Sequence, residues 1–109
     1  MRAPPSTAAG PNVKVARSAV HGRGLFARRR FRVGAYIGTF RGTPTKRNGL
    51  HVLWVVDDDG ARGLVGRNAL RFLNHDRQPN AELDGVDLYA IRNIQPGREI
   101  LIDYGDGWL

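Results

Sequence analysis

RFLNHDRQPN, residues 71–80, is the stretch of sequence that decides the fold of this chain. It contains few residues that favour regular secondary structure, and it ends in Pro79–Asn80, which imposes a rigid turn. Asn74 and His75 supply an amide and an imidazole, two side chains that both donate and accept hydrogen bonds. A surface loop has the same composition, so the neighbouring segments must distinguish a loop from a functional site.

The segments on either side are short and apolar, and glycine and proline separate them every few residues. This pattern is typical of short strands joined by tight turns. Asp58–Asp59–Gly60 and Asp84–Gly85 are expected hairpin turns, and Gln95–Pro96–Gly97 is a third turn. The one helical turn expected lies at residues 67–73 and is short or 3₁₀. Strands are expected at residues 13–17, 25–27, 35–41, 51–56, 61–65, 81–83, 86–91 and 98–104.

The last expected strand has a clear division into two faces, because successive side chains of a strand alternate. Ile100, Ile102 and Tyr104 share one face, and Leu101 and Asp103 share the other. Tyr104 is therefore expected to end an apolar stripe, with Asp103 directed away from it.

His21–Gly22–Arg23–Gly24–Leu25–Phe26 places two glycines one residue apart between expected strands. Such a pair lets backbone groups approach a ligand closely, although ordinary turns contain it too. It is not a dinucleotide-binding fingerprint, because the third glycine and the following helix are missing. The neighbours His75 and Asp76 suggest a metal or hydrolytic site as an alternative. Adjacent side chains rarely face each other and the three histidines lack ligand spacing, so no metal site is expected.

Four segments, taken in order, resemble the SET-domain family of protein lysine methyltransferases. Members carry a G-x-G followed by an apolar pair, an aromatic-x-G strand, an R-F-x-N-H segment that runs on to P-N, and a G-E-E-L-x-x-D-Y strand. Here these segments are residues 21–26, 37–42, 71–80 and 97–104. The resemblance covers residues 13–109 and is to the small viral and bacterial members.

The resemblance implies a mostly β, β-clip-like fold of small curled sheets with little helix, in which segment 71–80 is threaded through a loop closed by the C-terminal strand. It predicts a disordered tail over residues 1–12 and a SET domain over residues 13–109. S-adenosylmethionine is the implied cofactor, with Asn74 at its amino group and the His75 backbone at its adenine. The residues implied to bind it are His21, Gly22, Arg23, Gly24, Arg71, Phe72, Asn74, His75, Tyr104 and Trp108.

The implied reaction moves a methyl group to a neutral lysine amine, with Tyr104 as the catalytic residue that orients the amine. Phe40, Leu83 and Tyr104 are implied to bind the substrate lysine. A carboxylate beside the amine would hold it charged, so the opposite facing of Asp103 suits this chemistry. Phe40 stands where many members have tyrosine, and Leu83 stands where they have an aromatic residue. These departures leave the number of methyl groups open and motivate an alternative, a catalytically silent SET fold that binds peptide or nucleic acid.

The net charge of +7, with only two lysines among 17 basic residues, has two interpretations. One is a surface for nucleic acid or another acidic partner, and the other is an arginine-rich composition spread over a solvated surface. The expected substrate is a lysine-bearing protein, and histone-like, ribosomal and DNA-associated proteins all fit this expectation. Asp57–Asp58–Asp59 is either a docking patch for such a basic substrate or an ordinary hairpin turn.

Cysteine is absent, which excludes disulfides and thiolate zinc sites. No apolar run approaches the roughly 18 residues of a membrane span, and residues 1–11 lack the apolar core of a secretory signal. No membrane association is therefore expected. The expected location is intracellular and cytoplasmic, or a host nucleus for an exported effector. The resemblance also allows a homodimer in which the partner completes the site.

Overall fold

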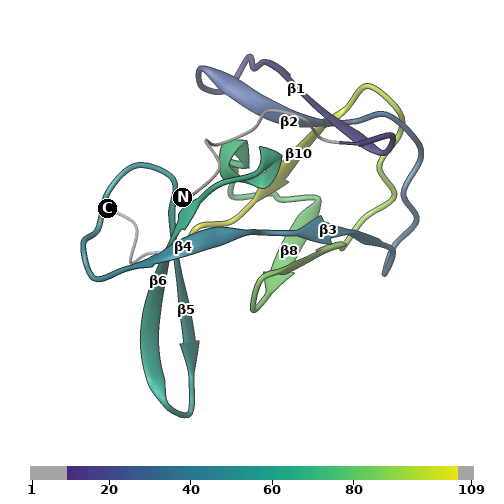
Figure 1. The fold of residues 1–109 in the computed structure, drawn as a ribbon. Helices are drawn as coiled ribbons and strands as arrows, with labels where there is room; N and C mark the ends of the chain where they lie inside the picture. The colour runs from purple at the N-terminus through teal and green to yellow at the C-terminus, as the bar shows by residue number, and fades with distance from the viewer. Residues whose placement is uncertain (1–9, 106–109) are drawn as a thin grey trace.

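The computed structural model describes residues 10–105, and its strands form three small sheets. The first sheet has the order β1-β2-β10-β7, with β1 Val13–Arg17, β2 Arg23–Ala27, β10 Glu99–Ile102 and β7 Asn74–His75. β2 pairs antiparallel with both β1 and β10, whereas β7 pairs parallel with β10. The sheet therefore joins the first two strands of the domain to its last (Figure 1).

The other two sheets are antiparallel and contain three strands each. One has the order β3-β9-β8, with β3 Tyr36–Thr39, β9 Asp87–Ala90 and β8 Ala81–Asp84. The other has the order β4-β6-β5, with β4 Gly42–Thr45, β6 Gly60–Gly66 and β5 Val52–Asp57. A 3₁₀ turn, η1 Ala69–Phe72, precedes β7. The hairpin of β5 and β6 projects from the rest of the molecule (Figure 1).

The expected mostly β fold is confirmed, and each of the eight expected strands matches an observed strand with ends shifted by at most a few residues. The short helical turn is confirmed as 3₁₀. The hairpin turn between β8 and β9 consists of Gly85 and Val86, one residue later than the expected Asp84–Gly85, because Asp84 ends β8 and pairs with Asp87. Gly85 has a φ of +61° that side-chain-bearing residues rarely adopt. Among residues 10–105, no helix has the length and apolarity needed to cross a membrane.

The structure contains two strands, β4 and β7, that the sequence did not predict. β4 contains Pro44, which lacks an N–H donor, so the segment does not have the pattern of a strand; it lies at the edge of its sheet, where proline is tolerated. β7 is only two residues long and lies within the polar stretch that resembles a loop. Its pairing with β10 is a contact between distant parts of the chain, which local propensity cannot predict.

The β7 segment is held against β10 by several bonds. Asn74 aligns with Leu101 and His75 with Ile102. Beyond β7, Asp76 N donates to the Ile102 carbonyl at 3.0 Å. Asn80 then bonds β10 with its side chain, accepting from Leu101 N at 2.8 Å and donating to the Glu99 carbonyl at 2.8 Å. Segment 74–80 is thus fastened along its length to the last strand.

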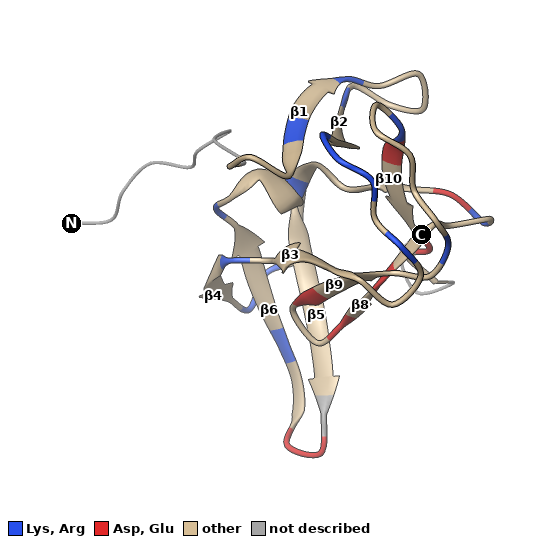
Figure 2. Ribbon diagram, turned by 90° about the vertical axis from the view of Figure 1, so that its right-hand side faces the viewer, with Lys and Arg blue, Asp and Glu red and all other residues tan. Residues whose placement is uncertain are grey.

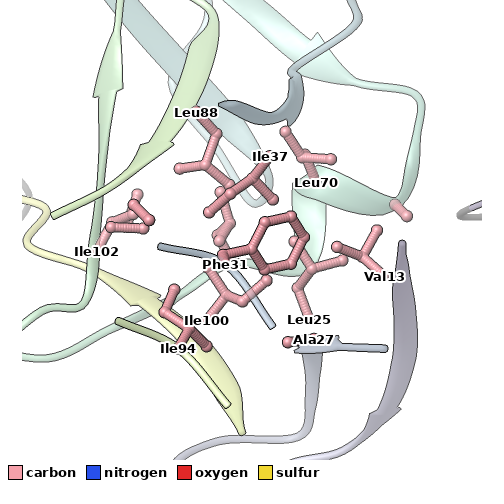
Figure 3. Packing of buried hydrophobic residues seen from close by; sticks show 14 of the residues in the cluster. Val13, Leu25, Ala27, Phe31, Ile37, Leu70, Leu88, Ile94, Ile100 and Ile102 are labelled. Carbon is pink, nitrogen blue, oxygen red and sulfur yellow. The ribbon is translucent and has the colours of Figure 1, made fainter. Parts of the chain in front are cut away.

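A single apolar core lies between the first two sheets and η1 (Figure 3). Its most deeply buried large side chains, each less than 2% exposed, are Phe31, Leu25, Leu88, Ile94 and Ile100. Ile100 and Ile102 are buried while Asp103 is exposed, which confirms the division of the last strand into two faces. Burial of this face fixes the position of Tyr104, which packs at the edge of the core.

Candidate active site

A cavity of about 520 Å³ lies where segments from all parts of the chain meet. The turn before β2, the segment before β5, η1 and the end of β10 all contribute to its walls. Its lining consists of residues 21–23, 49–53 and 70–74 together with Phe40, Leu83, Ile102 and Tyr104.

Nine of the site residues expected from the sequence line this one cavity. Gly24 and His75 do not line it, and Trp108 lies outside the described residues. The nine are His21, Gly22, Arg23, Phe40, Arg71, Phe72, Asn74, Leu83 and Tyr104.

Asn74 is the most constrained polar side chain of the cavity and is only 7% exposed. Its Nδ2 donates to the carbonyls of His21 at 2.9 Å and Arg23 at 3.0 Å, and to Glu99 Oε2 at 2.9 Å. Three acceptors around one amide nitrogen fix the orientation of the group, because a flipped amide would direct oxygen at oxygen. The Oδ1 atom accepts from no described residue, so Asn74 offers an acceptor to a ligand.

Glu99 lies behind Asn74 and is held from the other side by Ser18, whose hydroxyl donates to Oε1 at 2.6 Å. Space for this carboxylate exists because residue 24 is glycine. A Cβ at Gly24 would lie 2.2 Å from Glu99 Oε2, far inside van der Waals contact. The second glycine of the G-x-G pair therefore accommodates a half-buried carboxylate, whereas the sequence suggested close approach of the backbone to a ligand.

Tyr104 follows β10 and extends its apolar face into the cavity. Its hydroxyl donates to the Leu73 carbonyl, and its backbone N–H donates to His75 Nδ1 at 2.8 Å. Burial, and after it the negative charge of Glu99, raise the pKa of Tyr104 above the ordinary tyrosine value. The phenol therefore remains protonated at neutral pH and keeps its donor role.

Asp103 contributes little charge to the cavity. Its side chain is 48% exposed, and its Oδ1 lies 3.6 Å from His75 Nδ1. Because that nitrogen accepts the Tyr104 N–H, we assign the proton of a neutral His75 to Nε2, and the pair with Asp103 is then weak. The His75 ring lies 5.2 Å from the Tyr104 ring, so it supports the tyrosine from outside the cavity.

Two arginines bring positive charge to the cavity. Burial, followed by the charge of Arg23, lowers the pKa of Arg71, which indicates that the two guanidinium groups affect each other. Arg71 Nη1 donates to the Asn68 carbonyl at 2.9 Å, and its guanidinium lies 4.3 Å from the centre of the Phe72 ring. The positive charges of Arg71, which these contacts hold in place, and of the exposed Arg23 favour an anionic group of a ligand.

His51 is a cavity residue that sequence reasoning missed. It has a φ of +61°, which is uncommon for a residue with a side chain, and its Nδ1 lies 2.8 Å from the Arg71 carbonyl. Its ring makes an edge contact with Phe72 at 5.3 Å. No local pattern identifies a lone histidine of this kind. Glu99 was also missed as a site residue, although its place in the last family segment was a usable signal.

A second cavity, of about 500 Å³, shares a wall with the first. The shared residues are Leu53, Leu83, Ile102 and Tyr104. Its other lining includes Trp54 and Val56 of β5 and the carboxylate residues Glu82 and Asp103. The first cavity, by contrast, has no aspartate or glutamate among its described lining residues. Tyr104 and Leu83 thus separate a cationic inner cavity from an acidic outer one.

Comparison with known proteins was consistent at the levels of sequence and fold. A model of the SET domain matches residues 22–105. Human histone-lysine N-methyltransferase 2B is 31% identical over 114 aligned residues, which cover 84% of this chain and 4% of that protein. The chain therefore spans a very small part of the length of that relative.

Two solved structures share the fold at low sequence identity. The methyltransferase domain of human PR domain-containing protein 2 superposes with a TM-score of 0.68 at 21% identity, covering 97% of this chain and 92% of that chain. The ctPRC2 complex, in an autoinhibited conformation bound to S-adenosylmethionine, gives a TM-score of 0.75 at 19% identity, covering 88% of this chain and 15% of that one.

Proposed function

The chain belongs to the SET-domain family, and from that membership we propose that it transfers methyl groups from S-adenosylmethionine to lysine side chains of a protein substrate. The observation that carries the proposal is the inner cavity, where the Asn74 acceptor, two arginines and Tyr104 converge. When bound, the cofactor supplies a methyl group on a positively charged sulfur. The remaining work of binding, orienting and desolvating falls to residues of this chain.

The lining of the inner cavity fits this cofactor. The amino-acid end of S-adenosylmethionine carries an ammonium and a carboxylate. Asn74 Oδ1 would accept from the ammonium, since its Nδ2 is already committed to three acceptors. Arg23 and Arg71 would attract the carboxylate. The aromatic and apolar side chains beside them, Phe72 and Leu50, suit the adenine base.

The substrate lysine would enter from the outer cavity, past Leu83 and Tyr104. Glu82 and Asp103 in that cavity would attract a basic peptide segment by its charge. The amine must then lose its proton, because only a neutral nitrogen attacks carbon. For a free lysine with a pKa of about 10.4, this costs roughly 4–5 kcal/mol at neutral pH, at about 1.36 kcal/mol per pH unit.

The inner cavity is suited to lower this cost. Its apolar wall of Phe40, Leu53 and Leu83 disfavours a charged ammonium, and Arg23 and Arg71 repel it. No carboxylate among the described lining residues would hold the proton in place. The charge preference therefore reverses between the two cavities: the outer one attracts a cation, and the inner one favours the neutral amine.

Tyr104 would orient the amine without acting as its base. Its proton is donated to the Leu73 carbonyl, and its raised pKa disfavours the tyrosinate that a base would require. The phenol oxygen has acceptor capacity for an amine N–H, which would aim the nitrogen lone pair at the methyl group. Deprotonation is therefore left to solvent as the lysine enters.

Two measurements test this function in order. Calorimetry with S-adenosylmethionine should show saturable one-site binding, and absence of binding at millimolar cofactor would refute the cofactor assignment. Mass spectrometry of a lysine-containing peptide library incubated with protein and cofactor should then show methylated lysines. Binding of cofactor with no product on any lysine peptide would identify the catalytically silent alternative.

A further inference from the structure

The charges of this chain are divided along the sequence. The first acidic residue is Asp57, whereas 11 of the 17 lysines and arginines precede it. In the structure, six arginines of two loops come together at one end of the first sheet. We call these residues the arginine surface: Arg28, Arg29, Arg30, Arg32, Arg92 and Arg98, all of which are exposed.

The two loops that carry the arginine surface are fixed to each other through the backbone. Phe31 and Ile94 exchange backbone hydrogen bonds of 2.9 and 2.8 Å, and both side chains are only 1% exposed. Ala27 N donates to the Arg98 carbonyl at 2.9 Å, and Gly97 N donates to the Ala27 carbonyl at 2.8 Å. The buried side chains of Phe31 and Ile94 thus anchor the two loops to the core, while the arginine side chains are exposed to solvent.

Neighbouring carboxylates do not neutralise the arginine surface. Residues 28–34 and 91–98 contain no aspartate or glutamate. Arg28 Nη1 contacts the Gly10 carbonyl at 3.4 Å, and Arg29 Nε donates to the Arg30 carbonyl at 3.2 Å, so their partners are uncharged groups. Figure 2 shows blue on the loop after β2, and red on β8, β9 and β10 and at the tip of the β5–β6 hairpin. The acidic residue of β10 is Glu99, whose carboxylate is bonded to Ser18 and Asn74 rather than to an arginine. Six like charges therefore repel one another without compensation within the described chain.

The arginine surface and the active site lie at opposite ends of the same two strands. β2 begins at Arg23, a cavity residue, and ends at Ala27, next to Arg28. β10 begins at Glu99, next to Arg98, and leads to Tyr104 of the cavity. Because β2 and β10 are antiparallel, their arginine ends coincide and so do their cavity ends. A partner on the arginine surface would leave the cavity open.

We propose that the arginine surface binds the phosphate backbone of a nucleic acid, without regard to base sequence, while the catalytic cavity remains accessible. A planar guanidinium matches a phosphate with two parallel hydrogen bonds, and all six cations of the surface are arginines. The largest apolar residue between them, Phe31, is buried, and Val33 is a single exposed aliphatic side chain at 62%, so the surface offers charge rather than the apolar centre of a protein interface. The acidic outer cavity would repel the same polyanion and so orient it.

Fluorescence anisotropy of a labelled random-sequence DNA duplex at increasing salt tests the proposal. Each phosphate contact contributes about 0.9 to the slope of log affinity against log salt. The triple variant Arg29→Gln, Arg30→Gln, Arg92→Gln should therefore make the slope shallower, reducing its magnitude by about 2–3, and should weaken DNA binding at low salt. The matched control Lys46→Gln, Arg47→Gln, Arg62→Gln removes the same net charge from exposed positions in β6 and the segment after β4, and should lose much less affinity for DNA. The urea denaturation midpoint should be similar in both variants and in the unchanged protein, which reports that each variant is folded.

Two outcomes would overturn the proposal. Equal losses in the two triple variants would mean that net charge alone attracts DNA, with no defined surface. Polyglutamate competing as well as DNA, compared charge for charge, would mean that the surface recognises acidic polypeptides instead. Both outcomes are independent of methyl transfer, so they do not depend on the function proposed for the cavity.

Discussion

Replacing Gly24 by alanine should displace the Glu99 carboxylate, which holds the Asn74 side chain of the inner cavity in place. The new Cβ would lie 2.2 Å from Oε2 and 2.8 Å from Cδ of Glu99, and 3.1 Å from Cβ of Ser18. Gly24 is not among the glycines with positive φ, so the backbone itself tolerates alanine. The Glu99 carboxylate must therefore move, and its bonds to Ser18 and Asn74 are lost together.

The size of the effect follows from those two bonds. A hydrogen bond to a charged group contributes about 1.5–3 kcal/mol, so losing two costs about 3 kcal/mol at the lower end. Reduced chain entropy of the unfolded state returns about 0.4–1 kcal/mol for a glycine-to-alanine change. Gly24→Ala should thus lower the free energy of unfolding by about 2–3 kcal/mol, measured by urea denaturation. It should also weaken cofactor binding in calorimetry, because Asn74 loses one of its three anchors.

A double-mutant cycle with Glu99→Ala decides whether this reasoning is correct. In the Glu99→Ala background the clash partner is absent, so Gly24→Ala should be neutral or slightly stabilising. A loss of about 2–3 kcal/mol in both backgrounds would refute the account, since the glycine would then be required for a reason other than the carboxylate.

Three further predictions concern the cavity. Tyr104→Phe should lower turnover far more than cofactor affinity, with Tyr89→Phe as a control that removes a phenol elsewhere; equal losses in both parameters would make Tyr104 structural. In an alkaline titration followed by ultraviolet absorbance, the signal of Tyr104 is the one that disappears in the Tyr104→Phe variant. This tyrosine should ionise above a pH of about 10. Its raised pKa contributes stability that is present below that pH and lost as pH rises through the folded-state pKa, so a loss beginning below it would contradict the assignment. Phe40→Tyr adds a hydroxyl to the wall of the inner cavity and should lower the highest methylation state seen by mass spectrometry. An unchanged product distribution would place residue 40 away from the substrate amine.

The sequence predicts the elements of this fold better than their long-range pairing. Alternation in residues 98–104 correctly separates the buried side chains of Ile100 and Ile102 from exposed Asp103. Turn chemistry likewise places the hairpin at Gly85. By contrast, β7 is recognisable only after it has paired with β10, because its two residues carry no local preference for a strand. The family resemblance brought Asn74 and Tyr104 together where periodicity gave no signal.

The candidate site shows the same limit. Nine of its predicted residues line one cavity, yet the role of Gly24, which does not line it, depends on Glu99, 75 residues away in sequence. His51 joins the cavity through a turn with positive φ that no motif marks. Packing between distant segments creates such relations, and single-residue preferences do not encode them.

The fastening of segment 74–80 to β10 has a consequence for the order of events during synthesis. Asn74 meets its carboxylate partner only when Glu99 has been made, and Leu73 meets the phenol only with Tyr104. A growing chain on the ribosome therefore lacks a complete cofactor cavity until its last strand emerges, and contacts of such sequence separation form slowly. A chain that stops between residues 91 and 98 would contain the segments of nine strands but would lack β10, Glu99 and Tyr104. Cofactor binding at the proposed site therefore requires that translation has passed residue 104.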